Sequence, residues 1–298
     1  MLRPLLAILF VSLALPAQMI EIVGGTVTSP SGTNRGKGSL YRVDTSVYLL
    51  DFEMHLNVPV PDTLTFFLYR HHSRTGLATL DWTQQVQVTG GIGAAWYSSG
   101  PIAMPLVAGN YYVLGVYWNA NVQYFYTTAA QPPLSFGAWQ RAHTFTGSLP
   151  PTVSLAGSDI ACYYQRLTTL AVPAVVNTGT GCSATTLVPR LVADDFFFLN
   201  TTTTLQLVDA LPTAIALFGV ANNGALPVPI PLFGCSLWLD ISGPVFTFAA
   251  LTSGTGDAGL AIGVPPNPAL SGLTMSAQGL VFGPTAIDMS NAVSFTVQ

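Results

Sequence analysis

The chain has 298 residues, of which half are hydrophobic and only 7% are charged, and its formal net charge is −4. This length suits one large or two ordinary domains with a sizeable buried core. From position 171 onward Arg190 is the only Lys or Arg against six aspartates. That part therefore lacks the positive surface that nucleic-acid phosphates require, and we expect no nucleic-acid partner.

The first 17 residues are predicted to be a secretory signal peptide. Arg3 precedes an apolar run, Leu5 to Leu15, and the pattern predicts cleavage after Ala17 or Gln18. The run has about half of the roughly 20 residues that a membrane-spanning helix needs, and no transmembrane segment is expected elsewhere. The alternative is a buried N-terminal helix or strand. We therefore expect a secreted protein, extracellular or at a cell surface.

Hydrophobic residues alternate with a period of two through much of the region 18–170, which predicts antiparallel strands. The clearest stretch is "SVYLLDFEMHLNVP". One face of this strand is expected to be apolar, and Asp51, Glu53 and His55 fall on the other. The apolar positions are Tyr48, Leu50, Phe52, Met54 and Leu56.

A basic cluster follows the next apolar strand, in "YRHHSRTG". Because Gly76 and its polar neighbours suit a turn, we interpret Arg70, His71, His72 and Arg74 as the solvated tip of a hairpin. If this region binds an anionic glycan or surface, these four residues are the basic edge it would use. Binding would then be stronger at acidic pH, where histidine is charged.

Aromatic residues are concentrated between Trp96 and Tyr126. The stretch "AGNYYVLGVYWNANVQYFYTT" is interpreted as two strands joined near Asn119 to Asn121, a hairpin. Rings with a polar edge can form a sugar-binding platform. The alternative is that both faces of the hairpin are buried between sheets, since aromatic residues are common in strands. The candidate ligand-binding rings are Trp96, Tyr111, Tyr117 and Trp118.

Pro, Gly and Thr gather in residues 171–181, where the charge balance also shifts, and this segment is predicted to be a linker. It would join an N-terminal β-sandwich module, 18–170, to a C-terminal one, 182–298, because short apolar runs separated by turn residues are typical of sandwiches. In an oxidising compartment Cys182 and Cys235 are expected to form a disulfide that contributes about 3–4 kcal/mol. Cys162 would then be a free, buried thiol.

Two groups of motifs resemble known secreted proteins. The stretches "GTVTSPSGTNRGKGSLYRVDTSVYLLDFEMHL", "WYSSGPIAMPLVAGNYYVLGVYWN" and "YYQRLTT" resemble a secreted bacterial jelly-roll-like domain. The motif "GTGC", a later "GCSL" and "VPPNPALSGLTMSAQGLVF" look like a β-sandwich found at the C-terminus of secreted proteins of the same bacteria. The resemblance covers most of the chain after the signal peptide. It implies an all-β protein of two antiparallel sandwich modules and transfers no functional residue.

Catalytic and metal-binding patterns are sparse. Asp51 and Glu53 would lie about 6.6–6.8 Å apart on one strand face, a spacing compatible with a glycoside hydrolase, although a solvated strand face gives the same pattern. No cofactor is expected. Calcium is possible through carboxylates of Asp194, Asp195, Asp209 or Asp257. The sequence has no zinc-ligand spacing, nucleophile elbow, P-loop or dinucleotide fingerprint.

These features predict a secreted, non-catalytic structural or adhesive protein of the extracellular space or cell surface. The alternative is a carbohydrate-binding protein that uses the aromatic region 96–126, with an extracellular polysaccharide as its partner. A cell-surface protein is the alternative to a polysaccharide as the partner. A glycan-acting hydrolase that uses Asp51 and Glu53 is a remote alternative.

Overall fold

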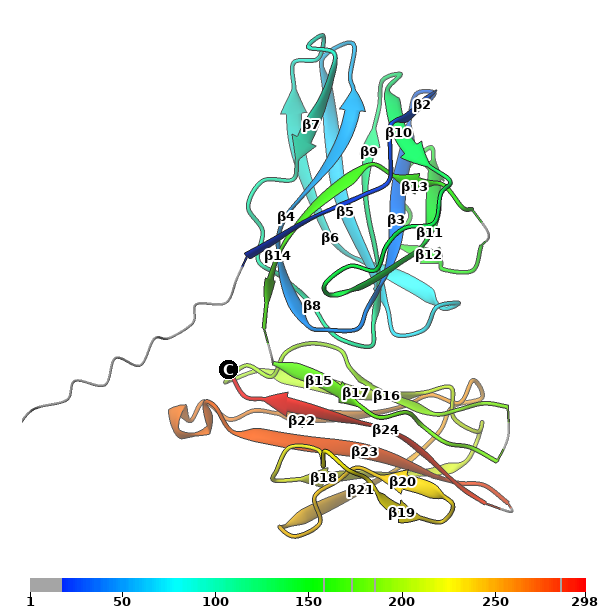
Figure 1. The fold of residues 1–298 in the computed structure, drawn as a ribbon, viewed down its shortest axis with the longest axis vertical. Coiled ribbons are helices and arrows are strands. Elements are labelled where there is room, and N and C mark those ends of the chain that lie inside the picture. The colour runs from blue at the N-terminus through cyan, green and yellow to red at the C-terminus, as the bar shows by residue number, and fades with distance from the viewer. Residues whose placement is uncertain (1–17, 158, 173, 185, 285) are drawn as a thin grey trace, which may run out of the picture.

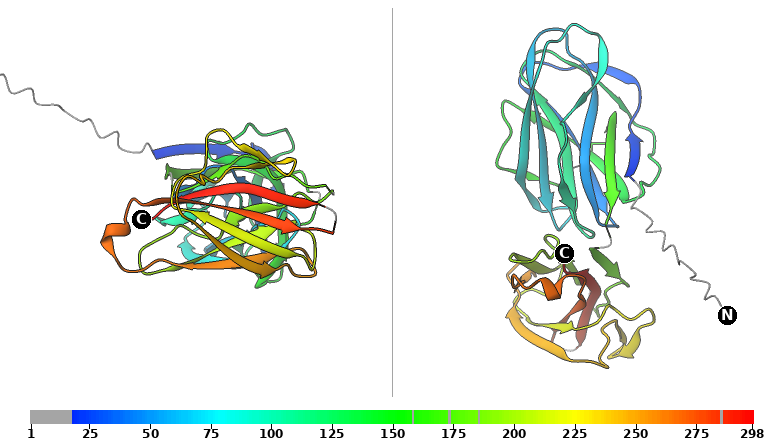
Figure 2. Two further views of the ribbon diagram at one scale, coloured as in Figure 1. Left: turned by 90° about the horizontal axis from the view of Figure 1, so that it is seen from below. Right: turned by 90° about the vertical axis from the view of Figure 1, so that its left-hand side faces the viewer.

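The computed structural model describes residues 18–298 except positions 158, 173, 185 and 285. The protein is all-β, as predicted, with five antiparallel sheets. The described residues include one short 3₁₀ helix, η1 (Pro268–Leu270), and no helix among them is long and apolar enough to cross a membrane. Strands from residues 18–171 and strands from residues 175–296 form separate sheets, stacked end to end (Figures 1 and 2).

The N-terminal part consists of two facing sheets. Their inner faces enclose one core, in which the rings of Phe52 and Phe66 meet edge to face at 5.2 Å. The first sheet has the order β1 (Gln18–Val23), β14 (Gln165–Ala171), β4 (Val47–Asn57), β10 (Gln123–Thr127), β13 (Cys162–Tyr163), with β2 (Val27–Pro30) beside β10, and β7 (Ala94–Ser98) and β8 (Met104–Leu106) beside β4. The second has the order β11 (Gly137–Thr146), β3 (Arg35–Val43), β9 (Tyr111–Trp118), β5 (Asp62–His71), β6 (Leu77–Val88), β12 (Thr152–Ser154).

The C-terminal part also has two main sheets around one core, where Phe197 stacks on Phe295 at 3.9 Å. The larger sheet has the order β15 (Val175–Thr178), β24 (Ile287–Thr296), β23 (Thr274–Phe282), β18 (Ile215–Ala221), β21 (Val245–Leu251). The smaller has the order β16 (Arg190–Ala193), β17 (Thr202–Val208), β22 (Ala258–Gly263), and β19 (Ile230–Leu232) pairs with β20 (Cys235–Leu237). Strand β15 lies within the segment 171–181 that was expected to be a linker. The division into two modules stays a prediction.

The predicted disulfide between Cys182 and Cys235 is present and confirms the expected pairing. It fastens the β19–β20 hairpin to the segment that precedes β16. Cys162 is free and buried, and burial raises the pKa of its thiol to about 12. A thiol in this environment is inert and acts as a small hydrophobic side chain.

The alternation along β4 is confirmed in its second half, and a bulge reverses it in the first half. The register against β14 shifts between Leu49 and Asp51, so Leu50 has no direct partner. One extra residue moves all preceding side chains to the opposite face. Leu49, instead of the predicted Leu50, is therefore fully buried.

The predicted hairpin near Asn119 to Asn121 is wrong. Strands β9 and β10 belong to different sheets, and the residues between them carry the chain from one sheet to the other. Strand β9 is buried along its whole length. Its outer face is covered by Leu155 and neighbouring apolar side chains, which form a second, smaller core. A strand buried on both faces is apolar throughout, which explains the aromatic excess here.

The N-terminal and C-terminal parts meet in a packed junction. Asn110, which is 1% exposed, donates a hydrogen bond from Nδ2 to the main-chain oxygen of Ala193 at 2.7 Å. The buried Ser46 hydroxyl donates to the main-chain oxygen of Val175 at 2.7 Å. Val107 inserts into the C-terminal core. Because these polar groups are buried and hydrogen-bonded, the N-terminal and C-terminal parts pack directly against each other and are not joined by the connecting segment alone.

Candidate functional site

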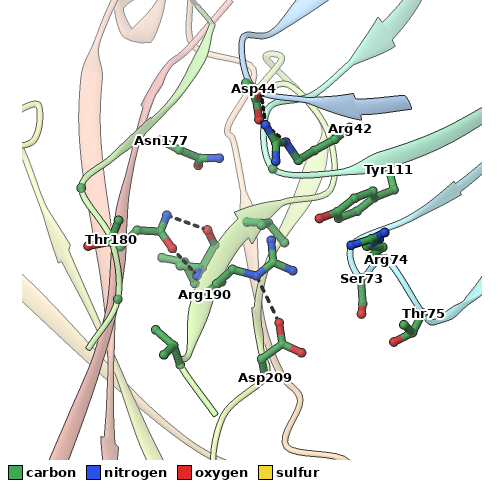
Figure 3. A pocket seen from close by; sticks show the side chains of 17 residues that line it. Arg42, Asp44, Ser73, Arg74, Thr75, Tyr111, Asn177, Thr180, Arg190 and Asp209 are labelled. Atoms are coloured by element: carbon green, nitrogen blue, oxygen red, sulfur yellow. Dashed lines mark hydrogen bonds and ion pairs between the residues drawn. The ribbon is translucent and has the colours of Figure 1, made fainter. Parts of the chain in front are cut away.

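A cleft of about 710 Å³ lies at this junction (Figure 3). One wall comes from the end of β3, the β5–β6 turn and the start of β9. The other comes from β15 and the loop that follows it, the start of β16 and the loop after β17. Binding sites for small molecules have volumes of about 300–1,000 Å³ and occur preferentially between domains. The cleft is therefore the candidate binding site.

Three guanidinium groups converge on the cleft, from Arg42, Arg74 and Arg190. Arg42 forms a two-pronged pair with Asp44, with Nε–Oδ1 at 2.7 Å and Nη2–Oδ2 at 2.8 Å, and this pairing raises the pKa of Arg42 above its ordinary value. Arg190 Nε lies 3.1 Å from Asp209 Oδ2. The three cations and two carboxylates leave the cleft with a net positive charge, in a chain whose overall charge is negative.

Arg74 is the cleft guanidinium without a carboxylate partner. It is exposed at the tip of the β5–β6 hairpin, and no ion pair involves it within the described part of the chain. The hydroxyl of Tyr111 points into the same space (Figure 3). The buried Oδ1 of Asn177 has no hydrogen-bond partner among the described residues. The Arg74 guanidinium is therefore available to a ligand, whereas the Oδ1 atom of Asn177 is buried.

The strand that carries Arg190 is held in place by two contacts. The side chain of Asn291 on β24 accepts from the main-chain nitrogen of Leu191 at 2.9 Å and donates to its oxygen at 3.0 Å. Across the junction, Arg190 Nη2 donates to the main-chain oxygen of His72 at 3.0 Å. The cleft wall is therefore positioned before any ligand binds.

A glycine brings the two walls close together. Gly109 has a φ of +92°, and a Cβ atom there would lie 2.7 Å from Val192 Cγ1 and 2.8 Å from Asn177 Nδ2. Both distances are too short for carbon, and the left-handed φ also disfavours a side chain. A larger residue at position 109 would strain the main chain and force the side chains of Val192 and Asn177 to shift.

The structure corrects the expectation that the tip of the basic hairpin is solvated. Strands β5 and β6 do form a hairpin, but its tip packs against the C-terminal part. Arg70 pairs with Asp81 at 2.8 Å and also donates to the main-chain oxygen of Asp194. Of the four basic residues only Arg74 is exposed.

The two adjacent histidines also differ from the expectation. The ring centroids of His71 and His72 are 4.1 Å apart. Burial, reinforced by His71, lowers the pKa of His72 to about 4. His72 is therefore uncharged between pH 5 and 8 and does not supply the expected positive charge at mildly acidic pH. Neither imidazole lines the cleft.

The four candidate aromatic rings do not form an exposed platform. Tyr111 and Tyr117 are each 8% exposed and Trp118 is fully buried. Trp96 is half-buried on β7, where the guanidinium of Arg166 lies 5.1 Å from its ring centroid. Tyr117 and Trp118 instead follow the alternative expectation, in which the aromatic rings are buried between layers.

Asp51 and Glu53 lie on the polar face of β4, as expected from the alternation. Glu53 forms an ion pair with Arg166 of the neighbouring strand. Asp51 accepts hydrogen bonds from the hydroxyls of Ser98 at 2.9 Å and Ser99 at 2.8 Å, while burial raises its pKa. Neither carboxylate lines the cleft.

The carboxylates considered for calcium are engaged separately. Asp209 pairs with Arg190, and Asp194 accepts from Gln206 at 3.3 Å. Asp195 accepts from the main-chain nitrogen of Phe196 at 2.7 Å, and Asp257 accepts from a neighbouring threonine hydroxyl at 2.7 Å. Among residues 18–298, apart from the four undescribed positions, no group of three or more His, Cys, Asp or Glu side chains is placed to hold a metal ion.

Comparisons with known proteins add little. No protein-family model and no curated protein matches this chain. A β-glucuronidase structure from Parabacteroides merdae overlaps it with a TM-score of 0.23 and 10% identity, over 84% of this chain and 28% of that one. A putative β-galactosidase from Bacteroides fragilis overlaps with a TM-score of 0.18 and 9% identity, over 88% and 32%. The chain thus spans less than a third of either protein, and TM-scores this low establish neither a common fold nor a common activity.

Proposed function

We propose that this protein is a secreted, non-catalytic binding protein whose cleft takes an acidic saccharide. One observation carries the proposal: three of the nine Lys and Arg residues of the chain line a single cleft, and one of the three, Arg74, has no carboxylate partner there. In a charge-poor protein this concentration of cations favours an anionic ligand.

The side chains of the cleft favour a sugar carboxylate over a phosphate. A guanidinium binds either anion through two parallel hydrogen bonds, so the two carboxylates of the cleft decide between them. Asp44 and Asp209 are acceptors suited to sugar hydroxyls, and their charges repel a ligand dense in phosphate. A uronic acid supplies both the single negative charge for Arg74 and the hydroxyl groups for these aspartates.

The arrangement of carboxylates supports a non-catalytic role. Glycoside hydrolysis requires two carboxyl groups that flank the scissile bond, one of them protonated as a general acid. In the cleft Asp44 is paired with Arg42 and Asp209 with Arg190, so neither carboxyl group is free to protonate a leaving group. Asp51 and Glu53 lie on a sheet face outside the cleft. The structural or adhesive role expected from the sequence remains a proposal, and the edge strand described below favours it.

Titration calorimetry with oligogalacturonate, and with its methyl-esterified, neutral form, tests the proposal. We expect the wild-type protein to bind the acidic form only. Arg74→Gln should weaken binding about tenfold or more, because a hydrogen bond to a charged group contributes about 1.5–3 kcal/mol. Arg35→Gln, which removes an arginine outside the cleft, is the matched control. No binding of the acidic form, or equal losses in both variants, would contradict the proposal.

The pH dependence of binding separates the cleft from the histidine pair. Affinity for oligogalacturonate should stay constant between pH 5 and 8, because His72 is uncharged throughout this range and neither histidine lines the cleft. An affinity that rises several-fold as the pH falls from 8 to 5 would show that the histidines contribute to binding.

Secretion is tested by the N-terminus of the exported protein. Expression in a secreting bacterial host, followed by intact-mass measurement, should give a chain that begins at Gln18 or Met19. Retention of residues 1–17 in the exported protein would refute the signal-peptide assignment.

A further inference from the structure

Strand β21 is an edge strand with the composition of a buried one. It ends the five-stranded sheet of the C-terminal part and, within the described structure, pairs only with β18 (Figure 1). Its sequence, "VFTFAAL", is a nearly continuous apolar run, and no charged residue occurs from Ile241 to Gly256. Such runs are typical of strands that are covered on both faces.

Both faces of β21 are nevertheless exposed. Phe246 and Phe248 lie on the core side of the strand and are 56% and 44% exposed. On the outer side Leu251 is 68% exposed and lies directly opposite Ile215, which in turn lies opposite Phe282. The last three side chains form one exposed apolar row across three strands.

The edge also lacks the usual protection against strand pairing. Natural edge strands are short, bulged, or marked by lysine or proline, because their free main-chain groups otherwise recruit another strand. Strand β21 pairs with β18 over seven consecutive residues without a register shift, and contains no proline or charged residue. The opposite edge of the same sheet, β15, has only four residues.

We propose that β21 pairs in antiparallel orientation with β21 of a second copy of this chain. The two five-stranded sheets then form one continuous sheet across a twofold axis, and the residues of β21 face the same strand of the second copy. Because residues 241–256 are uncharged, no like charges are brought together in this pairing.

The available area fits a weak, reversible dimer. Pairing through β21 brings together Phe246, Phe248 and Leu251 of the edge strand, which are 56%, 44% and 68% exposed, and large side chains carry on the order of 150–200 Å² each. Each copy therefore offers roughly 300 Å² of side-chain surface, and two copies together bury about 600 Å² besides the paired main chain, in the range of weak, transient interfaces. The dimer presents two clefts, which would strengthen attachment to a polymeric ligand without any new contact.

Sedimentation velocity of the protein exported from a secreting host tests the pairing, over about 1 µM to 1 mM. The wild type should shift from monomer to dimer with increasing concentration. Phe246→Lys and Leu251→Lys should each weaken the dimer at least about tenfold, because they place a charge at the paired edge. Val176→Lys, at a residue 46% exposed on the opposite edge strand, is the matched control and should dimerise normally.

Two results would overturn the proposal: a wild-type protein that stays monomeric over this range, or a Val176→Lys variant that loses dimerisation as strongly as the other two. Thermal melting checks that each variant is folded, and Leu251→Lys carries the test if Phe246→Lys is not. Hydrogen exchange adds a second measurement, since the main-chain amides of β21 should gain protection in the dimer. Saccharide binding by the monomer is measured separately, so the two proposals can fail independently.

Discussion

Asn110→Ala is expected to destabilise the protein by about 1–3 kcal/mol. The Asn110 side chain is buried and spans the junction through its hydrogen bond of 2.7 Å to Ala193. The substitution removes this donor from the main-chain oxygen of Ala193 within the buried junction, and the loss of one partner of a buried hydrogen bond costs about 1–3 kcal/mol. The loss is expected to be specific to this junction.

Urea unfolding followed by tryptophan fluorescence measures the effect. The control is Asn121→Ala, which changes the same residue type at an exposed position beyond the other end of β9. That variant should lie within about 0.5 kcal/mol of the wild type. Asn110→Ala should also weaken oligogalacturonate binding, because the junction positions the two walls of the cleft.

A loss in the free energy of unfolding below about 0.5 kcal/mol for Asn110→Ala would refute the reasoning. Removing a buried hydrogen bond must destabilise the protein more than a substitution at the surface does. A wild-type protein that unfolds in two well-separated transitions would also count against it. Strong coupling through the junction predicts that the N-terminal and C-terminal parts unfold together.

The cysteines and histidines give three further tests. Replacing Cys182 and Cys235 with alanine should lower the free energy of unfolding by about 4 kcal/mol, because the disulfide spans 53 residues; a loss below about 1 kcal/mol in non-reducing urea titrations would contradict this. Cys162, whose pKa burial raises to about 12, should resist alkylation at pH 8 in the native protein and react on unfolding; fast native labelling by mass spectrometry would show an exposed thiol. Burial lowers the pKa values of His72 and His143 to about 4, below the ordinary 6.5, so the unfolded state binds more protons between these values. The wild type should lose stability relative to a double His→Gln variant as the pH falls from 6.5 to 4, and parallel stability profiles would refute this.

Local sequence patterns predicted the strands well and their partners poorly. The alternation in β4 placed Asp51 and Glu53 on the polar face, because side-chain direction repeats every two residues. The same pattern failed at Leu50, where a bulge adds a residue. It also joined β9 and β10 into a hairpin that does not exist, because two successive apolar strands with a polar turn look alike whether they pair or cross between sheets.

The sequence alone predicted an all-β chain and showed the scarcity of cations after position 171, since both depend on composition or short-range patterns. It also predicted the Cys182–Cys235 pairing, because these two of the three cysteines lie in the C-terminal part. It also singled out the basic hairpin, although not its surroundings. Only the tertiary structure decided that Arg70 is held at the junction while Arg74 faces a cleft. The cleft joins Arg42, Arg74 and Arg190, which are far apart in the chain. No local pattern encodes that proximity, because it follows from how two sets of sheets pack together.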